Sequence, residues 1–196
     1  MRVGLVGMGV MGRNHYRVLK AMPAVEHLVV CDPAVQETIP EPTYGSAESM
    51  YRNETLDAVV VCVPTSQHLE VASEAIRGGV PVLIEKPLAS TAQEAQTLIA
   101  LASEYETPAV VGHVERFNPV VRSLMTELQD KEIYSINITR IGPFPPRIND
   151  VGVLVDLSVH DVDLVYCLTG GLRLIEGRVF KSTKRIGDRE DNAVIT

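Results

Sequence analysis

Apolar runs of strand length alternate with helix-periodic stretches through the first 113 residues of the chain. Each run is apolar at consecutive positions, which is typical of a strand that is buried on both faces in a parallel sheet. The spacing of Leu69, Ala72, Ala75 and Ile76 is one example of the helical pattern between runs. The pattern predicts a doubly wound α/β domain. The runs lie at residues 2–7, 27–32, 56–64, 80–85 and 107–113.

The alternation of strand-length apolar runs with helical stretches ends at about residue 118. Residues 132–140 alternate apolar and polar side chains, which predicts a strand with one solvated face and therefore an antiparallel sheet. A proline-rich loop follows. Residues 153–171 then carry a helical pattern that ends at two glycines suited to a C-cap, and residues 175–185 predict one more strand.

The length of 196 residues leaves room for two domains. We predict a doubly wound domain over residues 1–117 and an α+β domain with an antiparallel sheet over residues 118–196, whose sheet would be incomplete at its C-terminal end. The net charge of -7 argues against a nucleic-acid surface, because phosphate binding needs clustered lysine and arginine. We therefore expect a small-molecule partner.

Cys31, Cys62 and Cys167 are odd in number and lie in apolar surroundings. They predict buried free thiols in a reducing compartment, not a disulfide framework or a metal site. The N-terminus lacks the pattern of a signal peptide, and the longest apolar runs are far shorter than the ~20 residues that span a bilayer. We expect a cytoplasmic protein without a membrane segment.

A glycine-rich motif directly follows the first apolar run. Gly7, Gly9 and Gly12 have the spacing of a dinucleotide-binding turn, in which they allow a tight turn, the approach of a pyrophosphate and close helix packing. Asp32 ends the second run, twenty residues after Gly12, where its carboxylate would accept hydrogen bonds from ribose hydroxyls and repel a 2′-phosphate. The motif predicts NAD rather than NADP. A plain glycine-rich turn, with Asp32 as a turn residue before Pro33, is the alternative.

Ligands of a doubly wound sheet lie beyond the carboxyl ends of its strands. Pro87 cannot continue a strand, so it ends the fourth run and biases Lys86 toward an extended conformation. Glu85 and Lys86 could be an ordinary pair of solvated charges, but their position at the ligand edge favours a role in the site. The predicted cofactor contacts are Gly7, Met8, Gly9, Val10, Met11, Gly12, Asp32, Pro64, Thr65, His68, Glu85 and Lys86.

Asp156 and His160 are four residues apart and would share one face of the predicted helix. A hydroxyl that is oxidised by NAD must lose a proton as the hydride leaves, so it needs a base and a cation near the developing alkoxide. His160 suits the first task, Lys86 the second, and Asp156 could orient the imidazole. An ordinary interior histidine is the alternative. A zinc site is disfavoured because His68, His113, His160 and Cys62 lack metal-ligand spacing, so we predict no metal.

The segments "GMGVMG", "VPTSQH", "EKP" and D-x-x-x-H occur in the order seen in the Gfo/Idh/MocA oxidoreductases, the glucose-fructose oxidoreductase and inositol dehydrogenase family, which the chain resembles over nearly its whole length. The resemblance implies an N-terminal Rossmann domain and a C-terminal sheet used to form a homo-oligomer. It also implies that Lys86 contacts both nicotinamide and substrate, with His160 as the acid/base and Asp156 as its companion.

The expected activity is an NAD(P)-dependent oxidation or reduction of a secondary hydroxyl of a sugar or nucleotide-sugar. The segments "GHVERFNP" and "GPFPPRI" are similar to the branch of the family that includes UDP-N-acetylglucosamine 3-dehydrogenases. Predicted substrate contacts are Lys86, Arg116, Asn118, Arg147 and His160, with Arg147 suited to a phosphate or carboxylate. The alternatives are a non-catalytic NAD-binding sensor or partner protein, and a lyase or glycosidase that retains its NAD.

Overall fold

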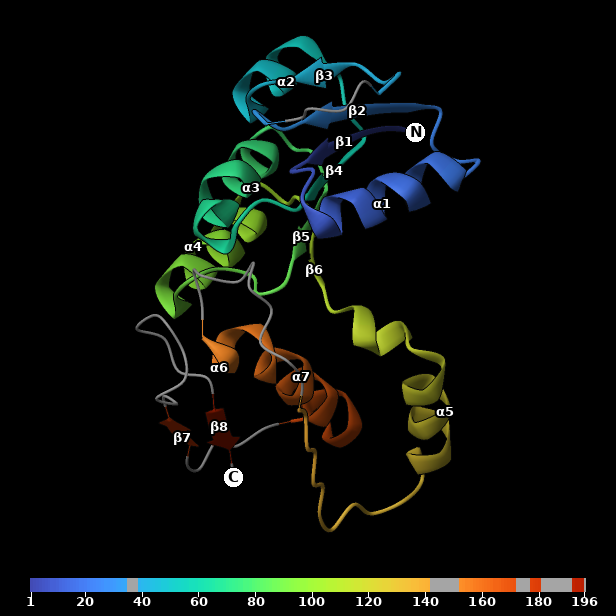
Figure 1. Ribbon diagram of the computed structural model, residues 1–196, viewed down its shortest axis with the longest axis vertical. Helices are drawn as coiled ribbons and strands as arrows, with labels where there is room; N and C mark the ends of the chain where they lie inside the picture. Colours follow the sequence, from blue (N-terminus) through green and yellow to red (C-terminus); the bar gives the residue numbers. More distant parts are fainter. Residues whose placement is uncertain (35–38, 142–151, 172–176, 181–191, 196) are drawn as a thin grey trace. The chain divides into compact units, whose positions relative to one another are not determined.

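The computed structural model describes residues 1–34, 39–141, 152–171, 177–180 and 192–195 (Figure 1). Two compact units make up the chain, Met1–Gly112 and His113–Thr196. The predicted boundary after residue 117 stays a prediction, and the compact units divide earlier, where the last strand of the first unit ends.

A six-stranded parallel sheet forms the first unit, in the order β3-β2-β1-β4-β5-β6. This order confirms the predicted doubly wound fold. Five of the strands lie within the five apolar runs, whereas β3 was not predicted because a two-residue strand leaves no periodic pattern. The strands are β1 (Arg2–Val6), β2 (His27–Cys31), β3 (Thr43–Tyr44), β4 (Ala58–Val61), β5 (Val82–Glu85) and β6 (Ala109–Gly112).

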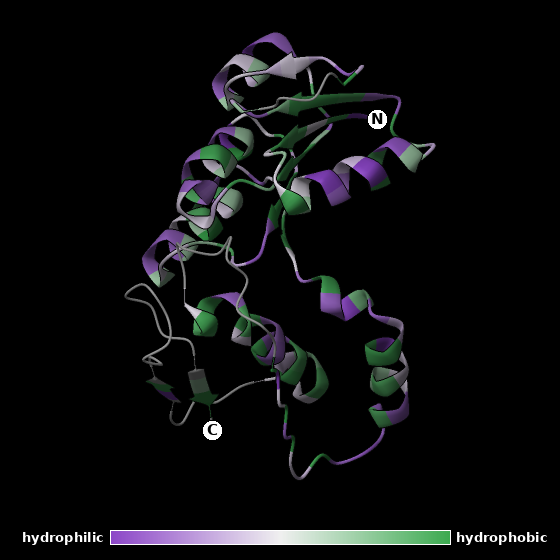
Figure 2. Cartoon of the chain, in the orientation of Figure 1, coloured by the Kyte–Doolittle hydropathy of each residue, from purple (hydrophilic) through white to green (hydrophobic). Residues whose placement is uncertain are grey.

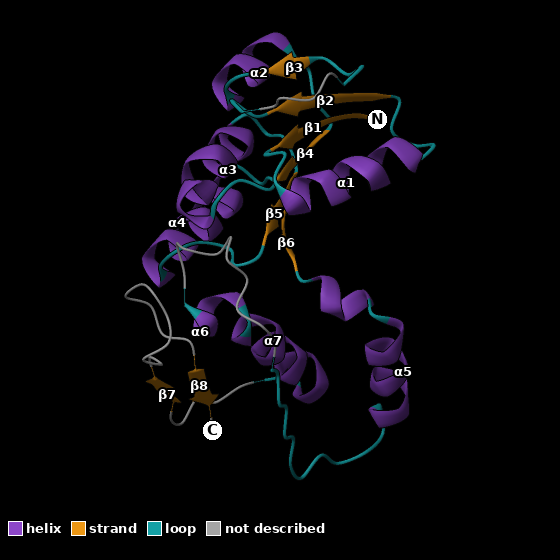
Figure 3. Cartoon of the chain, in the orientation of Figure 1, coloured by secondary structure: helices purple, strands orange, loops and turns teal. Residues whose placement is uncertain are grey.

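Helices cover both faces of this sheet, with α1 on one side and α3 and α4 on the other (Figure 3). Neighbouring residues of one strand enter different cores: Val29 packs in the cluster that contains Ile76 of α3 and Leu98 of α4, and Val30 packs in the cluster that contains Leu19 of α1. The strands are therefore apolar at consecutive positions (Figure 2). The helices are α1 (Val10–Ala21), α2 (Ala47–Asn53), α3 (His68–Arg77) and α4 (Ala92–Glu104), with the 3₁₀ helix η1 (Thr65–Gln67) before α3.

The second unit contains short helices and a two-stranded antiparallel sheet, so the predicted α+β character is confirmed. Asn118 caps α5 by accepting a hydrogen bond from Val120 N at 3.0 Å, and Pro119 occupies the first helical turn. Among the described residues, no helix has both the length and the apolar character needed to cross a membrane. The elements are η2 (Val114–Phe117), α5 (Pro119–Leu128), α6 (Val153–Asp156), α7 (Ser158–Thr169), β7 (Gly177–Phe180) and β8 (Asn192–Ile195).

Two predictions in this unit are wrong. Residues 132–140 form no strand in the structure, because an alternating pattern makes a strand only when the backbone finds a hydrogen-bonded neighbour. The helix predicted over residues 153–171 is divided at Leu157, where His160 N bonds to Leu157 O at 3.1 Å in a tighter turn. No glycine or proline marks this break. The predicted C-cap is correct, since α7 ends at Gly170 in the left-handed region (φ 71°).

Candidate functional site

The three glycines of the motif have different surroundings. Gly7 has a φ of +96°, and a Cβ at this position would lie 2.6 Å from the backbone carbon and oxygen of Cys62. A Cβ on Gly12 would lie 1.9 Å from the carbonyl oxygen of Gly7. Gly9 has no atom within 4 Å of the corresponding position. The protein's own packing therefore explains Gly7 and Gly12, whereas the space beside Gly9 is open to a ligand.

This glycine loop lies at the point where the strand order reverses. The chain proceeds from β1 to β2 and β3 on one side, and returns to β4, the other neighbour of β1, before continuing outward. The contact between Gly7 and Cys62 joins the loops that leave these two adjacent strands. Helix α1 begins after Gly9 with no side-chain cap and no acidic residue in its first turn. Its amides and the positive end of its dipole are suited to a pyrophosphate.

Asp32 follows β2 at the same edge of the sheet. Its Oδ2 accepts a hydrogen bond from Met8 N at 2.6 Å, and its Oδ1 accepts one from Ala34 N at 2.7 Å. The carboxylate thus holds the glycine loop, and a carboxylate has about four acceptor positions, so it retains capacity for ribose hydroxyls.

The remaining predicted loop contacts differ in exposure. Met8 is buried in the core, whereas Val10 is largely exposed and Met11 is partly exposed at the start of α1. Pro64 is exposed and Thr65 is buried.

His68 is buried between the loops that follow β4 and β5. Its Nδ1 lies 2.9 Å from the carbonyl oxygen of Pro87, and its Nε2 lies 3.0 Å from that of Val63. The ring is therefore occupied by backbone contacts inside the unit. His68 therefore joins the loops that leave β4 and β5 at the carboxyl ends of these strands.

Lys86 follows β5, the neighbour of β4, so it emerges at the same edge as the glycine loop. It is half-buried, and its peptide bond to Pro87 is cis. Glu85, by contrast, is 5% exposed, and its Oε1 lies 2.7 Å from Nε2 of His15 on α1. The solvated charge pair considered from the sequence is therefore not what the structure contains.

Sequence reasoning missed His15. Its only sequence signal is its position three residues after Gly12, in the second turn of the predicted helix. Donor atoms of His15, Cys62 and Glu85 lie within 4.8 Å of one another, which is a possible set of metal ligands. Burial, together with the charge of Glu85, raises the pKa of the Cys62 thiol well above its ordinary value.

In the second unit, Arg116 and Asp163 form a forked pair between η2 and α7. Arg116 Nε donates to Asp163 Oδ2 at 2.8 Å, and Asp163 is only 8% exposed. His113 Nε2 lies 3.7 Å from Asp163 Oδ1. The hydrogen bond to Asp163 raises the pKa of the Arg116 guanidinium. The predicted substrate contact Arg116 thus has a structural partner, which sequence reasoning did not assign to it.

The other predicted residues of this unit are more dispersed. Asp156 is the last residue of α6 and His160 lies in α7, so the single helical face expected for them is not formed. Both are half-buried. Asn118 caps α5. Arg147 lies outside the described residues.

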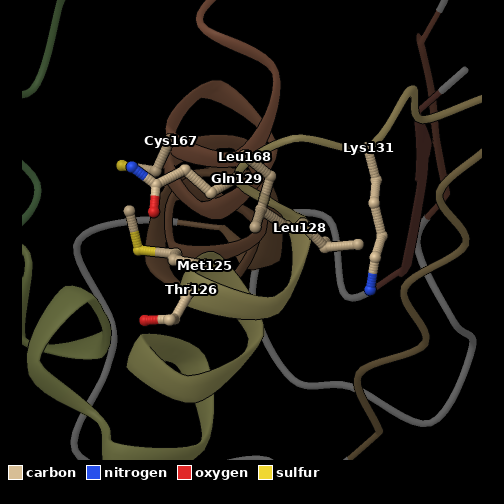
Figure 4. A pocket seen from close by; sticks show the side chains of 7 residues that line it. All are labelled: Met125, Thr126, Leu128, Gln129, Lys131, Cys167 and Leu168. Carbon is tan, nitrogen blue, oxygen red and sulfur yellow. The ribbon is translucent and has the colours of Figure 1, made fainter.

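A hollow of about 440 Å³ lies between α5 and α7 (Figure 4). Met125, Thr126 and Leu128 come from α5, and Cys167 and Leu168 come from α7. None of the predicted site residues lines it, so it does not mark the predicted chemistry.

Residues 1–113 match the model of the Gfo/Idh/MocA oxidoreductases, which is described as an oxidoreductase family with an NAD-binding Rossmann fold. The chain belongs to this family. The match covers the glycine loop, Asp32 and Lys86, and it confirms the predicted fold and NAD as the cofactor.

The relatives with similar sequences are named for different substrates. The chain is 33% identical over 174 residues to UDP-N-acetylglucosamine 3-dehydrogenase of Acidithiobacillus ferrooxidans, covering 87% of this chain and 55% of the relative. It is 27% identical over 183 residues to inositol 2-dehydrogenase of Rhizobium meliloti, covering 87% and 55%. The solved structure of GenD2 from gentamicin A biosynthesis in complex with NAD has a TM-score of 0.85 at 26% identity, covering 100% and 61%. The chain thus spans little more than half the length of the curated relatives that it matches.

Proposed function

We propose that the protein is an NAD-dependent dehydrogenase that acts on a secondary hydroxyl of a sugar or nucleotide-sugar. The observation that carries the proposal is the position of Lys86 at the carboxyl end of β5, on the same sheet edge as the open space beside Gly9. A cation at this edge, close to the switch point of the sheet, is suited to a developing alkoxide.

Bound NAD would supply the hydride acceptor. Around it, the N-terminus of α1 would hold the pyrophosphate and Asp32 the ribose. Lys86 would stabilise the substrate oxygen as its charge develops. His160 would take the hydroxyl proton, with Asp156 orienting the imidazole. The predicted substrate contacts Arg116, Asn118 and Arg147 stay part of the proposal, but Arg116 and Asn118 also hold η2 and α5 in place.

The name of the relative at 33% identity supports a nucleotide-sugar, and UDP-N-acetylglucosamine oxidised at C3 is the specific candidate. The similarity to an inositol 2-dehydrogenase at 27% identity makes cyclic polyols the comparison class. We further propose a cytoplasmic homo-oligomer that associates through the C-terminal sheet.

The test is to incubate the protein with NAD and a panel of sugars, inositols and UDP-sugars, following both NADH absorbance and product mass. Lys86→Ala should bind NADH as the wild type does but lower kcat by roughly 10²-fold or more, the effect of removing one group that stabilises an oxyanion. Lys131→Ala, an exposed lysine of the second unit, is the matched control and should leave turnover unchanged.

Other outcomes would support the alternatives. Unchanged turnover in Lys86→Ala would refute the assignment of Lys86. NADH binding with no product from the whole panel would favour a sensor or partner protein. A change of product mass without net NADH would favour a lyase or glycosidase that retains its cofactor.

A further inference from the structure

Glu85 is a buried carboxylate at the meeting point of three elements of the first unit. It is the last residue of β5, and its Oε1 lies 2.7 Å from Nε2 of His15 on α1. Its Oε2 accepts a hydrogen bond from the backbone N of Lys86 at 3.2 Å. Gly112, the last residue of β6, pairs with Glu85 in the sheet. A carboxylate at 5% exposure is costly unless its oxygens are satisfied, and here each oxygen has its own donor.

Gly112 makes room for this carboxylate. A Cβ at Gly112 would lie 3.1 Å from Cδ and Oε1 of Glu85 and 3.2 Å from Oε2. These distances are shorter than ordinary van der Waals contacts, so an alanine would displace the carboxylate by a few tenths of an ångström. Residues of α1, β5 and β6 therefore together surround the Glu85 carboxylate.

The two oxygens of Glu85 contact two different parts of the cofactor edge. One oxygen contacts His15, on the helix whose N-terminus faces the pyrophosphate site, and the other contacts the peptide of the proposed alkoxide-stabilising lysine. Because the carboxylate accepts on both sides, the His15 nitrogen that faces it must carry a proton. The connection between the helix and the lysine thus depends on one side chain.

We propose that His15 and Glu85 are positioning residues that couple the cofactor-binding helix α1 to Lys86 and hold the Lys86 backbone in place for the reaction. This inference rests on the proposed function for the role of Lys86. The coupling itself, from α1 through Glu85 to the Lys86 peptide, is a property of the first unit alone and has readouts that do not require turnover.

Glu85→Gln separates charge from geometry. The glutamine oxygen can still accept from Lys86 N, while its NH₂ group donates to His15 Nε2, which must then be the unprotonated nitrogen. The expected result is loss of the proton from His15 Nε2, which leaves the ring protonated on Nδ1. Long-range ¹H–¹⁵N spectra of ¹⁵N-histidine-labelled protein measure this directly.

Two further variants disturb positioning without touching a group that would contact substrate. His15→Ala removes the donor on α1, and Gly112→Ala displaces the carboxylate while every polar group remains. Each should shift the amide resonance of Lys86 and lower kcat by up to roughly 10-fold, because a displacement of a few tenths of an ångström is a fraction of the ~1 Å misplacement that costs up to ~10²-fold. The KM for substrate and the Kd for NADH should change by less than about 3-fold.

His27→Ala is the matched control. His27 and Glu54 form a second histidine-glutamate pair of the same unit, with 3.4 Å between His27 Nε2 and Glu54 Oε2. His27 is the first residue of β2, so this pair lies at the opposite edge of the sheet from Lys86. This variant should leave the Lys86 amide resonance, kcat and NADH affinity at their wild-type values.

The outcomes separate this inference from the proposed function. If wild-type protein turns over no substrate of the panel, the proposed function fails, but the His15 tautomer and the Lys86 amide resonance still test the coupling. An unshifted Lys86 amide in both His15→Ala and Gly112→Ala would overturn it. A loss of kcat that is no larger than the loss of NADH affinity would also overturn it. So would a shift of the Lys86 amide resonance that is equal to the shift in His27→Ala. Stoichiometric zinc in the purified protein that is lost in Cys62→Ser would also overturn it, because Glu85 would then be a metal ligand.

Discussion

Gly9 and Gly12 lie three residues apart, but alanine should act on them in opposite ways. In Gly12→Ala the Cβ would lie 1.9 Å from the Gly7 oxygen, 1.1 Å short of the 3.0 Å that real Cβ contacts essentially never undercut. Helix α1 must shift, which should destabilise the protein by about 1–3 kcal/mol and lower Tm by about 2–4 °C for each kcal/mol. Gly9 has φ −66° and ψ −164°, which any residue adopts, and nothing within 4 Å of an added Cβ. Gly9→Ala should cost at most about 1 kcal/mol, because alanine is only a poorer N-cap.

The same methyl group on Gly9 would occupy the space open to the pyrophosphate. Losing one charge-assisted hydrogen bond from the loop amides costs about 1.5–3 kcal/mol, which corresponds to roughly 10- to 150-fold in the Kd for NADH. The fluorescence of NADH, excited at a wavelength that no protein side chain absorbs, gives its Kd by titration, and circular dichroism gives Tm. Wild-type NADH affinity in Gly9→Ala, or a wild-type Tm in Gly12→Ala, would refute the division of roles between the two glycines.

Three further predictions concern buried or loop-holding side chains. Asp32→Ala should lower the preference for NADH over NADPH by at least about 10-fold in paired titrations, because the charge that repels a 2′-phosphate is removed; an unchanged ratio would contradict the ribose assignment. Asp163→Asn should destabilise the protein by about 1–3 kcal/mol in urea, since Arg116 loses its ionised partner, whereas exposed Asp130→Asn should have no effect. Burial raises the pKa of the Cys31 thiol from 9.0 to about 11, so the unfolded chain loses this proton first. Stability should therefore fall as pH rises from about 9 to about 11, and a Cys31→Ala variant should show a smaller fall.

Much of the first unit was predictable from local sequence. The apolar runs predicted five of the six strands, because strands buried on both faces are apolar at consecutive positions. The spacing of the glycines and Asp32 predicted this edge of the sheet because a tight turn followed by a closely packed helix needs glycine at fixed positions. A Cβ on Gly12 would meet the oxygen of Gly7, although the atoms that crowd Gly7 belong to the distant Cys62. The predictions therefore fit best where a residue type is required by its own turn or by its own position in a buried strand.

The second unit was harder to predict. Alternation over residues 132–140 predicted a strand that the structure lacks, because pairing needs a partner that a single segment does not specify. The break at Leu157 separates Asp156 from the helix of His160 without any glycine or proline to announce it. The spacing of apolar residues does not indicate where the backbone hydrogen bonds of a strand or a helix stop.

The sequence by itself determined the fold class, the cofactor and the edge of the sheet where Lys86 lies, because strand patterns and motif spacing depend on residues that are close together in the sequence. Only the tertiary structure decided which polar groups meet. His15 and Glu85 are 70 positions apart, and Arg116 and Asp163 are 47 apart. These pairs form because strand order and helix packing bring their elements together. Glu85, which the sequence predicted as a cofactor contact, is buried, and its Oε1 lies against His15 of α1.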